Sequence, residues 1–195
     1  MTKYKPVTPA IIAELQDIVG PKNVITDPEQ MVPYSHDEIA DPRLHHMPEV
    51  VVFAENTEQV AAVVKLANRE LIPVVPRGAG TGLACAVVPI YGGIVLSLEK
   101  MNRILEINAD KLYMIVEPGV RTEYLQQVAK AQGLYYAGDP SSGDSCFIGG
   151  NVATNAGGNR AVKYGTTRNQ VYGFEMVTPQ GDIVYLGSRT QKNTT

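Results

Sequence analysis

The sequence predicts an α+β fold built on mixed sheets, and two observations carry this prediction. Residues 49–75 read as strand, helix, strand, which is the pattern of a right-handed crossover between parallel strands. Residues 104–116 and 171–186 each read as two short apolar runs joined by a polar turn, as in an antiparallel hairpin. A chain that combines a crossover with hairpins contains both parallel and antiparallel pairing.

The N-terminal region, residues 1–47, is predicted to hold a helix and an arm. Thr8 and Pro9 supply an N-cap and a proline at the first helical position, and Gly20 marks the end of the helix. The apolar residues of one helix face are Ile11, Ile12, Leu15, Ile18 and Val19. Residues 27–46 are polar and proline-rich, so we expect a solvated arm. Its histidines, His36, His45 and His46, lack the ligand spacing of known metal sites.

Residues 48–195 are expected to form one domain, with a division into two lobes near residues 97–103. Its first strand is predicted at 50–53, followed by a cap at Asn56 and Thr57, a helix, and a strand at 71–75. Three further strands are predicted at 94–98, 104–107 and 113–116, the last two joined by a turn at 108–111. We expect Thr122 to cap a helix that ends at Gly133. The final hairpin pairs 171–178 with 183–186.

Composition excludes several classes of function. The chain has 195 residues, of which 44% are hydrophobic and 19% charged, enough for one core or two small lobes. A net charge of −3 and the lack of a lysine or arginine cluster argue against nucleic acid as a partner. No apolar run approaches the roughly 20 residues of a transmembrane helix. Only two cysteines, Cys85 and Cys146, are present, so we expect a cytoplasmic protein with neither disulfides nor a metal site.

The first candidate site directly follows the predicted strand at 71–75. Its residues are Pro76, Arg77, Gly78, Ala79, Gly80, Thr81 and Gly82. Three glycines at alternate positions let the backbone turn its N–H groups inward, which suits a phosphate. The spacing is that of neither a P-loop nor a Rossmann fingerprint. A tight loop that only reverses the chain is the alternative.

The second candidate site lies about 70 residues further on and is rich in small residues. Its members are Asp139, Pro140, Ser141, Ser142, Ser145, Gly149, Gly150, Asn151, Ala153, Thr154 and Asn155. Glycines flanked by amides and hydroxyls indicate a backbone that lies against a flat ligand. Two such segments, each expected after a strand, suit one extended ligand such as a dinucleotide. We therefore predict that residues 148–155 and 76–82 face a shared groove.

Several segments in order resemble the FAD-binding domain of the glycolate oxidase/D-lactate dehydrogenase family. They are residues 76–82, 92–98, 101–104, 116–120, 133–136, 139–142, 148–158 and 163–165. The resemblance is strongest over residues 48–187 and implies the fold of vanillyl-alcohol oxidase and p-cresol methylhydroxylase. It implies FAD as cofactor, with the amides of residues 77–82 on the pyrophosphate and residues 140–155 along the ribityl chain and flavin ring.

The resemblance further implies the chemistry of a flavin-dependent oxidoreductase that acts on D-2-hydroxy acids such as glycolate or D-lactate and passes electrons to an acceptor. Relatives with covalent FAD often carry a histidine in the first loop, where this chain has Thr81, so noncovalent FAD is expected. Catalytic groups are expected beyond residue 195, which makes the domain C-terminally incomplete and the isolated chain inactive.

Two alternatives remain. The bulky segment 83–87, where the family has more glycine, favours a noncatalytic nucleotide-binding module or electron-transfer subunit fragment. The enolpyruvyl-sugar reductase branch of the same fold is the other alternative.

Overall fold

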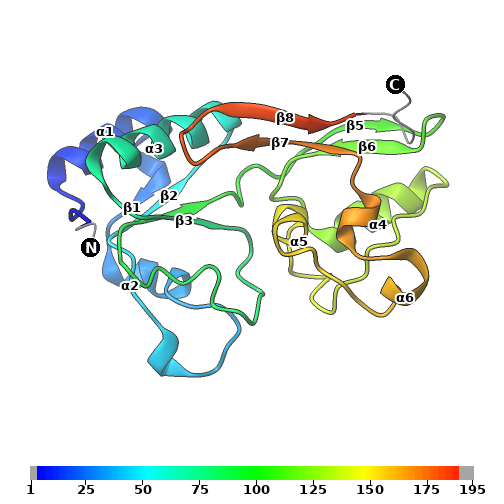
Figure 1. The fold of residues 1–195 in the computed structure, drawn as a ribbon, viewed down its shortest axis with the longest axis horizontal. Coiled ribbons are helices and arrows are strands. Elements are labelled where there is room, and N and C mark those ends of the chain that lie inside the picture. The colour runs from blue at the N-terminus through cyan, green and yellow to red at the C-terminus, as the bar shows by residue number, and fades with distance from the viewer. Residues whose placement is uncertain (1–3, 189–195) are drawn as a thin grey trace. The chain divides into compact units, whose positions relative to one another are not determined.

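The computed structural model describes residues 4–188 of the chain and has the predicted α+β architecture. The chain divides into two compact units (Figure 1). The first comprises Met1–Lys100 and Val177–Ile183, and the second comprises Met101–Met176 and Val184–Thr195. Among the described residues, no helix combines the length and apolar character needed to cross a membrane.

The first unit is built on a four-stranded mixed sheet in the order β1-β2-β4-β3. The strands are β1 (Val24–Ile25), β2 (Val50–Phe53), β3 (Val74–Arg77) and β4 (Ile94–Ser97). β4 pairs in parallel with both β2 and β3, whereas β1 runs antiparallel to β2. β2 and β4 are buried along their whole length, because helices cover both faces of the sheet. This burial explains why both strands read as continuous apolar runs.

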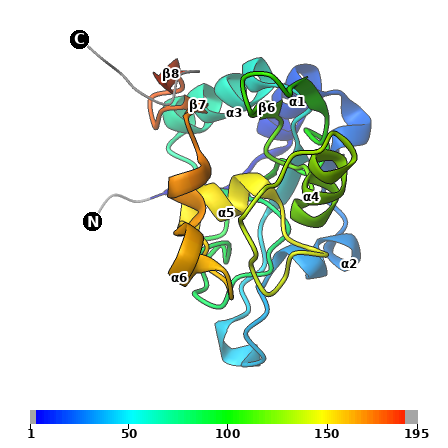
Figure 2. The same ribbon diagram turned by 90° about the vertical axis from the view of Figure 1, so that its right-hand side faces the viewer.

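Helices α1 (Pro9–Val19) and α3 (Thr57–Glu70) lie side by side on one face of this sheet (Figures 1 and 2). The predicted caps are confirmed, since Thr8 accepts from the Ile11 N–H and Asn56 accepts from the Gln59 N–H. The opposite face carries α2 (Pro28–Met31), whose Met31 packs against Val51, Phe53 and Val95. Both faces of the central strands therefore contribute to the core of this unit.

The predicted solvated arm is wrong in its first half. Short 3₁₀ turns follow α2 at Val32–Tyr34 and Pro42–Leu44. Met31, Ser35 and Asp37 are buried, although residues 42–47 are exposed as expected. Proline-rich polar sequence reads as solvated, but here its few inward side chains pack against the sheet and against the loop after β3.

The strand predicted at 71–75 is displaced to Val74–Arg77. Leu71 adopts the left-handed conformation, with a φ of 55°, and its N–H caps the end of α3. The chain therefore needs two more residues before it can enter the sheet. As a consequence, Pro76 and Arg77 belong to β3, and the irregular loop begins at Gly78.

The second unit contains two-stranded antiparallel ribbons and short helices. Its strands are β5 (Ile104–Asn108), β6 (Tyr113–Val116), β7 (Gly173–Val177) and β8 (Ile183–Gly187), although Val177 and Ile183, at the ends of β7 and β8, belong to the first unit. Its helices are α4 (Thr122–Ala131), α5 (Ile148–Thr154), α6 (Ala161–Tyr164) and a 3₁₀ turn at Thr167–Gln170. Val120, Leu125 and Ile148 form its core with apolar residues of β5 and β6. Both predicted hairpins are confirmed.

Two local predictions in this unit are wrong. Arg121, not Thr122, is the N-cap of α4; the Thr122 side chain is buried and bonded to other segments. The small-residue segment is not a loop after a strand, because Ile148–Thr154 forms α5 after an irregular stretch that makes only an isolated bridge between Phe147 and Arg121. Small residues suited a helix here because the helix backbone lies close to another segment.

Candidate functional site

The loop after β3 exposes unpaired backbone donors. Within the described part of the chain, none of the backbone N–H groups of residues 78–84 donates a hydrogen bond. Gly80 has a φ of 79°, which favours glycine, and Cys85 ends the loop with a φ of 55°. A β-carbon on Gly82 would have no atom within 4 Å. The loop therefore offers a run of free donors and open backbone to an external acceptor.

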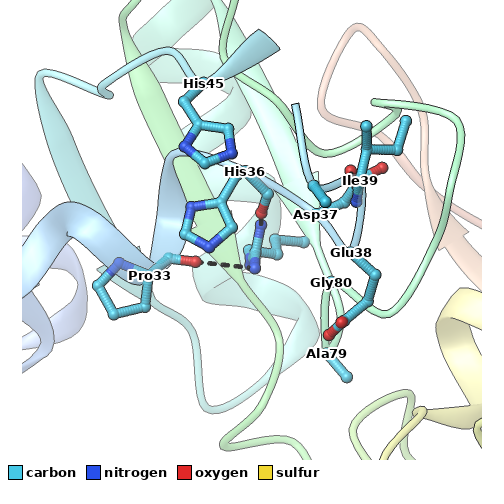
Figure 3. A pocket seen from close by; sticks show the side chains of 10 residues that line it. Pro33, His36, Asp37, Glu38, Ile39, His45, Ala79 and Gly80 are labelled. Atoms are coloured by element: carbon cyan, nitrogen blue, oxygen red, sulfur yellow. Dashed lines mark hydrogen bonds between the residues drawn. The ribbon is translucent and has the colours of Figure 1, made fainter. Parts of the chain in front are cut away.

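Arg77 anchors the start of this loop with its side chain. The side chain is buried, and the residue is only 7% exposed. Its Nη1 donates to the His36 carbonyl oxygen at 2.7 Å and its Nη2 to that of Pro33 at 2.9 Å (Figure 3). The guanidinium also lies 5.5 Å from the Tyr34 ring centroid. Burial lowers the pKa of Arg77 and raises the pKa of Tyr34 to about 12, the latter with help from Glu99.

The loop and residues 33–45 line an open cavity of about 450 Å³ (Figure 3). It is lined by Pro33, His36, Asp37, Glu38, Ile39, Ala40, His45, Arg77, Ala79 and Gly80. The rings of His36 and His45 stack with their centroids 4.4 Å apart. The described residues contain no group of three histidine, cysteine or acidic side chains that could hold a metal ion.

In the second unit, α5 presents two glycines with opposite surroundings. A β-carbon on Gly149 would come within 2.5 Å of the Pro118 Cβ, so this glycine permits close packing. A β-carbon on Gly150 would meet no atom within 4 Å. Nothing within the described chain therefore requires a glycine at position 150, and the backbone there is open to a ligand.

Asn151 differs from the other polar residues of the second segment because it points inward. It is 4% exposed, and its Nδ2 donates to the Thr122 hydroxyl at 2.6 Å. The same hydroxyl lies 3.3 Å from the sulfur of Cys146. Burial, and secondarily Cys146, raises the pKa of the nearby Tyr136 to about 12. The Asn151 side chain thus joins α5 to α4. Its burial favours this structural role over contact with a ligand.

The remaining predicted residues of the second segment are mostly accessible. Ser141, Ser145, Ala153, Thr154 and Asn155 are exposed, whereas Asp139, Pro140 and Ser142 are half-buried. Asn155 takes the left-handed conformation and accepts from the Arg168 N–H at 3.0 Å. Gly158 lies so close to the Asp139 carbonyl that it leaves no room for a β-carbon. The two ends of the stretch from 139 to 158 therefore lie in close contact within one unit.

The structure brings the predicted residues together in two groups. Residues 76–82 lie in the first unit, and Asp139 to Asn155 lie in the second. The shared groove between them stays a prediction. Sequence reasoning missed the contribution of Pro33, His36 and Asp37 to the first loop. No local signal identified it, because the segment has no apolar periodicity and lies about 40 residues away in sequence.

Comparison with known proteins gives a family and a set of relatives. The family described as FAD binding domain matches residues 48–187. The chain is 45% identical over 192 residues to a D-lactate dehydrogenase of Anaerostipes hadrus, covering 98% of this chain and 40% of that protein. It is 42% identical over 187 residues to a D-2-hydroxyglutarate dehydrogenase of Stutzerimonas stutzeri, covering 96% and 40% respectively. The chain thus spans about 40% of the length of these curated relatives.

Solved structures share the fold. An alkyldihydroxyacetonephosphate synthase superposes with a TM-score of 0.82 at 22% identity, over 97% of this chain and 36% of that one. A substrate-bound p-cresol methylhydroxylase gives a TM-score of 0.74 at 26% identity, over 89% and 34%. The predicted p-cresol methylhydroxylase-type fold is confirmed.

Proposed function

The chain belongs to the FAD binding domain family, and we propose that it is the cofactor-binding part of a flavoenzyme that oxidises a D-2-hydroxy acid. The observation that carries the proposal is the identity of 42–45%, over nearly the whole chain, to proteins named for D-lactate and D-2-hydroxyglutarate. A third relative, 37% identical, is the glycolate oxidase subunit GlcD of Bacillus subtilis. The chain spans about 40% of the length of the first two relatives. The activity and the substrate of the whole protein are therefore part of the proposal.

The first loop fits the pyrophosphate of FAD. Unpaired N–H groups in residues 78–84 can donate to phosphate oxygens, and a donor without a partner is costly once water is excluded. The open backbone at Gly82 allows close approach. We assign Gly78, Ala79, Gly80, Thr81 and Gly82 to this contact. Pro76 and Arg77, which were predicted to belong to the same site, lie in β3, and we do not assign them to this contact.

The second segment fits the flat part of the cofactor. The open backbone at Gly150 would let a ring system lie against α5. The exposed hydroxyls and amide of Ser145, Thr154 and Asn155 are available as hydrogen-bonding groups at its edge. Asn151 supports the segment from beneath through Thr122.

Bound FAD supplies the acceptor for the hydride that leaves the α-carbon of the hydroxy acid. The task of this chain is to bind the cofactor, orient it and exclude water on the protein side. We expect noncovalent attachment, since Thr81 stands where covalent relatives often carry histidine. We also expect a cytoplasmic location, since both cysteines are free thiols, and an electron acceptor that is a separate partner.

Flavin content tests this proposal. Titration of the purified chain with FAD should change the flavin absorbance, and denaturation should release the flavin because no covalent bond holds it. The protein expressed from the complete gene should bleach under anaerobic conditions with D-lactate, D-2-hydroxyglutarate or glycolate. A colourless protein that binds no FAD would contradict the proposal, and a yellow protein that no hydroxy acid bleaches would favour a noncatalytic module.

A further inference from the structure

Three hydrogen-bonded ties join residues 33–38 to the loop after β3. The Arg77 guanidinium, at the start of the loop, donates to the carbonyls of Pro33 and His36. In the middle of the loop, the Gly82 carbonyl accepts from the Glu38 N–H at 3.1 Å. At its end, the Cys85 N–H donates to the Asp37 carboxylate at 2.7 Å. The loop is thus held before, within and after its glycines by one short segment.

Asp37 is the central member of this arrangement. It is 6% exposed, and its two carboxylate oxygens take different roles. Oδ1 accepts from the Ile39 N–H at 3.0 Å, which closes a turn over residues 37–39, and Oδ2 accepts from the Cys85 N–H. Cys85 has a φ of 55°, a conformation that non-glycine residues rarely adopt without external support. The Asp37 carboxylate supplies that support.

Gly80 shows how closely the loop and Arg77 fit together. A β-carbon on Gly80 would lie 2.1 Å from Arg77 Nη2, so the loop backbone rests directly on the guanidinium that holds Pro33 and His36. A shift of residues 33–38 would therefore move the guanidinium and the loop together. The cavity of Figure 3 is the space left between the two segments.

In each of these ties, the partner from residues 33–38 lies outside the part of the chain that the FAD binding domain family matches, because that part begins at residue 48. Among residues 4–188, the loop amides of residues 78–84 have no hydrogen-bond acceptor, so their directions depend on these neighbouring restraints. Preorganised donors bind an anion more tightly than donors that must first be ordered, because the ordering entropy has already been lost.

We propose that residues 33–38 form a clamp that fixes the glycine loop for the pyrophosphate of FAD, with Asp37 and Arg77 as positioning residues that do not themselves contact the cofactor. The inference rests on the proposed function, since the clamp affects FAD only if this loop binds it. Within the matched domain alone, beginning at residue 48, the loop would lack all three ties.

The test compares Asp37→Asn with Asp41→Asn in the full 195-residue chain. The asparagine introduced by Asp37→Asn keeps the size of aspartate but offers one acceptor oxygen where two are needed. Asp41 is a matched control, because it also accepts from a backbone N–H two residues on, that of Arg43, and among the described residues its hydrogen bonds and ion pair go to Arg43 and not to the loop. FAD and ADP, which has the pyrophosphate but no flavin, are titrated separately by calorimetry, and amide hydrogen exchange is followed without ligand.

We expect Asp37→Asn to lower the affinity for FAD and the affinity for ADP by the same factor, at least about tenfold. The affinities of Asp41→Asn should stay within about twofold of those of the unchanged chain. Exchange should quicken at Cys85 and remain slow in β2 and β4. Equal binding by Asp37→Asn and the unchanged chain would overturn the clamp. Faster exchange throughout β2 and β4 would also overturn it, because Asp37 would then stabilise the unit as a whole.

Asp37→Ser serves as a second variant if Asp37→Asn does not fold. A serine hydroxyl can accept from the Ile39 N–H and preserve the local turn, while leaving Cys85 without a partner. The same tenfold loss is expected, and unchanged binding overturns the proposal. If the unchanged chain binds neither FAD nor ADP, the proposed function itself fails, an outcome that is distinct from loss of binding in the variant alone.

Discussion

Gly149 lies against Pro118 so closely that a β-carbon on the glycine would come within 2.5 Å of the proline Cβ. The neighbouring Gly150 has no such contact, so close packing accounts for the glycine at position 149 and not for the one at position 150.

We predict opposite effects of alanine at these two positions. Gly149→Ala should destabilise the second unit, because the Pro118 contact leaves no room for a methyl group and overpacking costs about 1–3 kcal/mol. Gly150→Ala should leave the free energy of unfolding unchanged or raise it by up to about 1 kcal/mol, because alanine favours the helix. Gly150→Ala should nevertheless lower the affinity for FAD at least about tenfold. Thermal unfolding and FAD titration of both variants check this, and unimpaired FAD binding by Gly150→Ala would remove α5 from the site.

Asn151→Ala should destabilise the chain by about 1–3 kcal/mol, since it leaves the buried Thr122 hydroxyl without its donor. The loss should appear in chemical denaturation of the ligand-free chain. Thr154→Ala is the comparison, because the exposed Thr154 hydroxyl, in the described part of the chain, bonds only within its own helix, to the Gly150 carbonyl. We expect its unfolding free energy to stay within about 0.5 kcal/mol of the unchanged chain. Equal losses in the two variants would contradict the supporting role of Asn151.

Acid should weaken the link between Arg103, just before β5, and Glu117, just after β6. Burial raises the pKa of this carboxyl, but hydrogen bonds and charge from Arg103 outweigh burial and lower the pKa overall. A carboxyl with a lowered folded-state pKa contributes stability above its unfolded pKa of roughly 4.3, and this contribution is lost as the pH falls through the folded value. Denaturation as a function of pH should therefore show a smaller acid-induced loss in Glu117→Gln than in the unchanged chain. An equal acid-induced loss of stability in Glu117→Gln and the unchanged chain would contradict the stabilising role of Glu117.

The 195-residue chain should bind FAD weakly and should not oxidise D-lactate or glycolate. Residues 145–174, which include the part of the second site segment from Ser145 onward, contain no histidine, aspartate or glutamate to accept the proton of a substrate hydroxyl, and Asp139 is ion-paired with Arg160. Anaerobic mixing with FAD and a panel of D-2-hydroxy acids, followed by flavin absorbance, measures this directly. Rapid bleaching would place catalytic groups within this chain, with Tyr136 and Lys163 as the first candidates for substitution.

The regular elements could be predicted because their signals are local. The strands at 50–53, 94–97, 104–108 and 113–116 follow from short apolar runs, and the helix Pro9–Val19 from its cap and periodic apolar face. The glycine loop was also predicted correctly from residue 78 onward, since alternating glycines restrict what the backbone can form. The start of β3 was wrong because Leu71, a residue with no turn signal, caps α3 in the left-handed conformation.

The sequence by itself determined the α+β class, the family resemblance and the two glycine-rich segments, because periodicity, turn residues and motif order are properties of neighbouring residues. Only the tertiary structure decided the roles of Arg77, Asp37 and Asn151. Each of these side chains acts through a hydrogen bond to a residue 29–48 positions away. Such partners are chosen by packing, which brings distant segments together and buries polar groups that must then be satisfied.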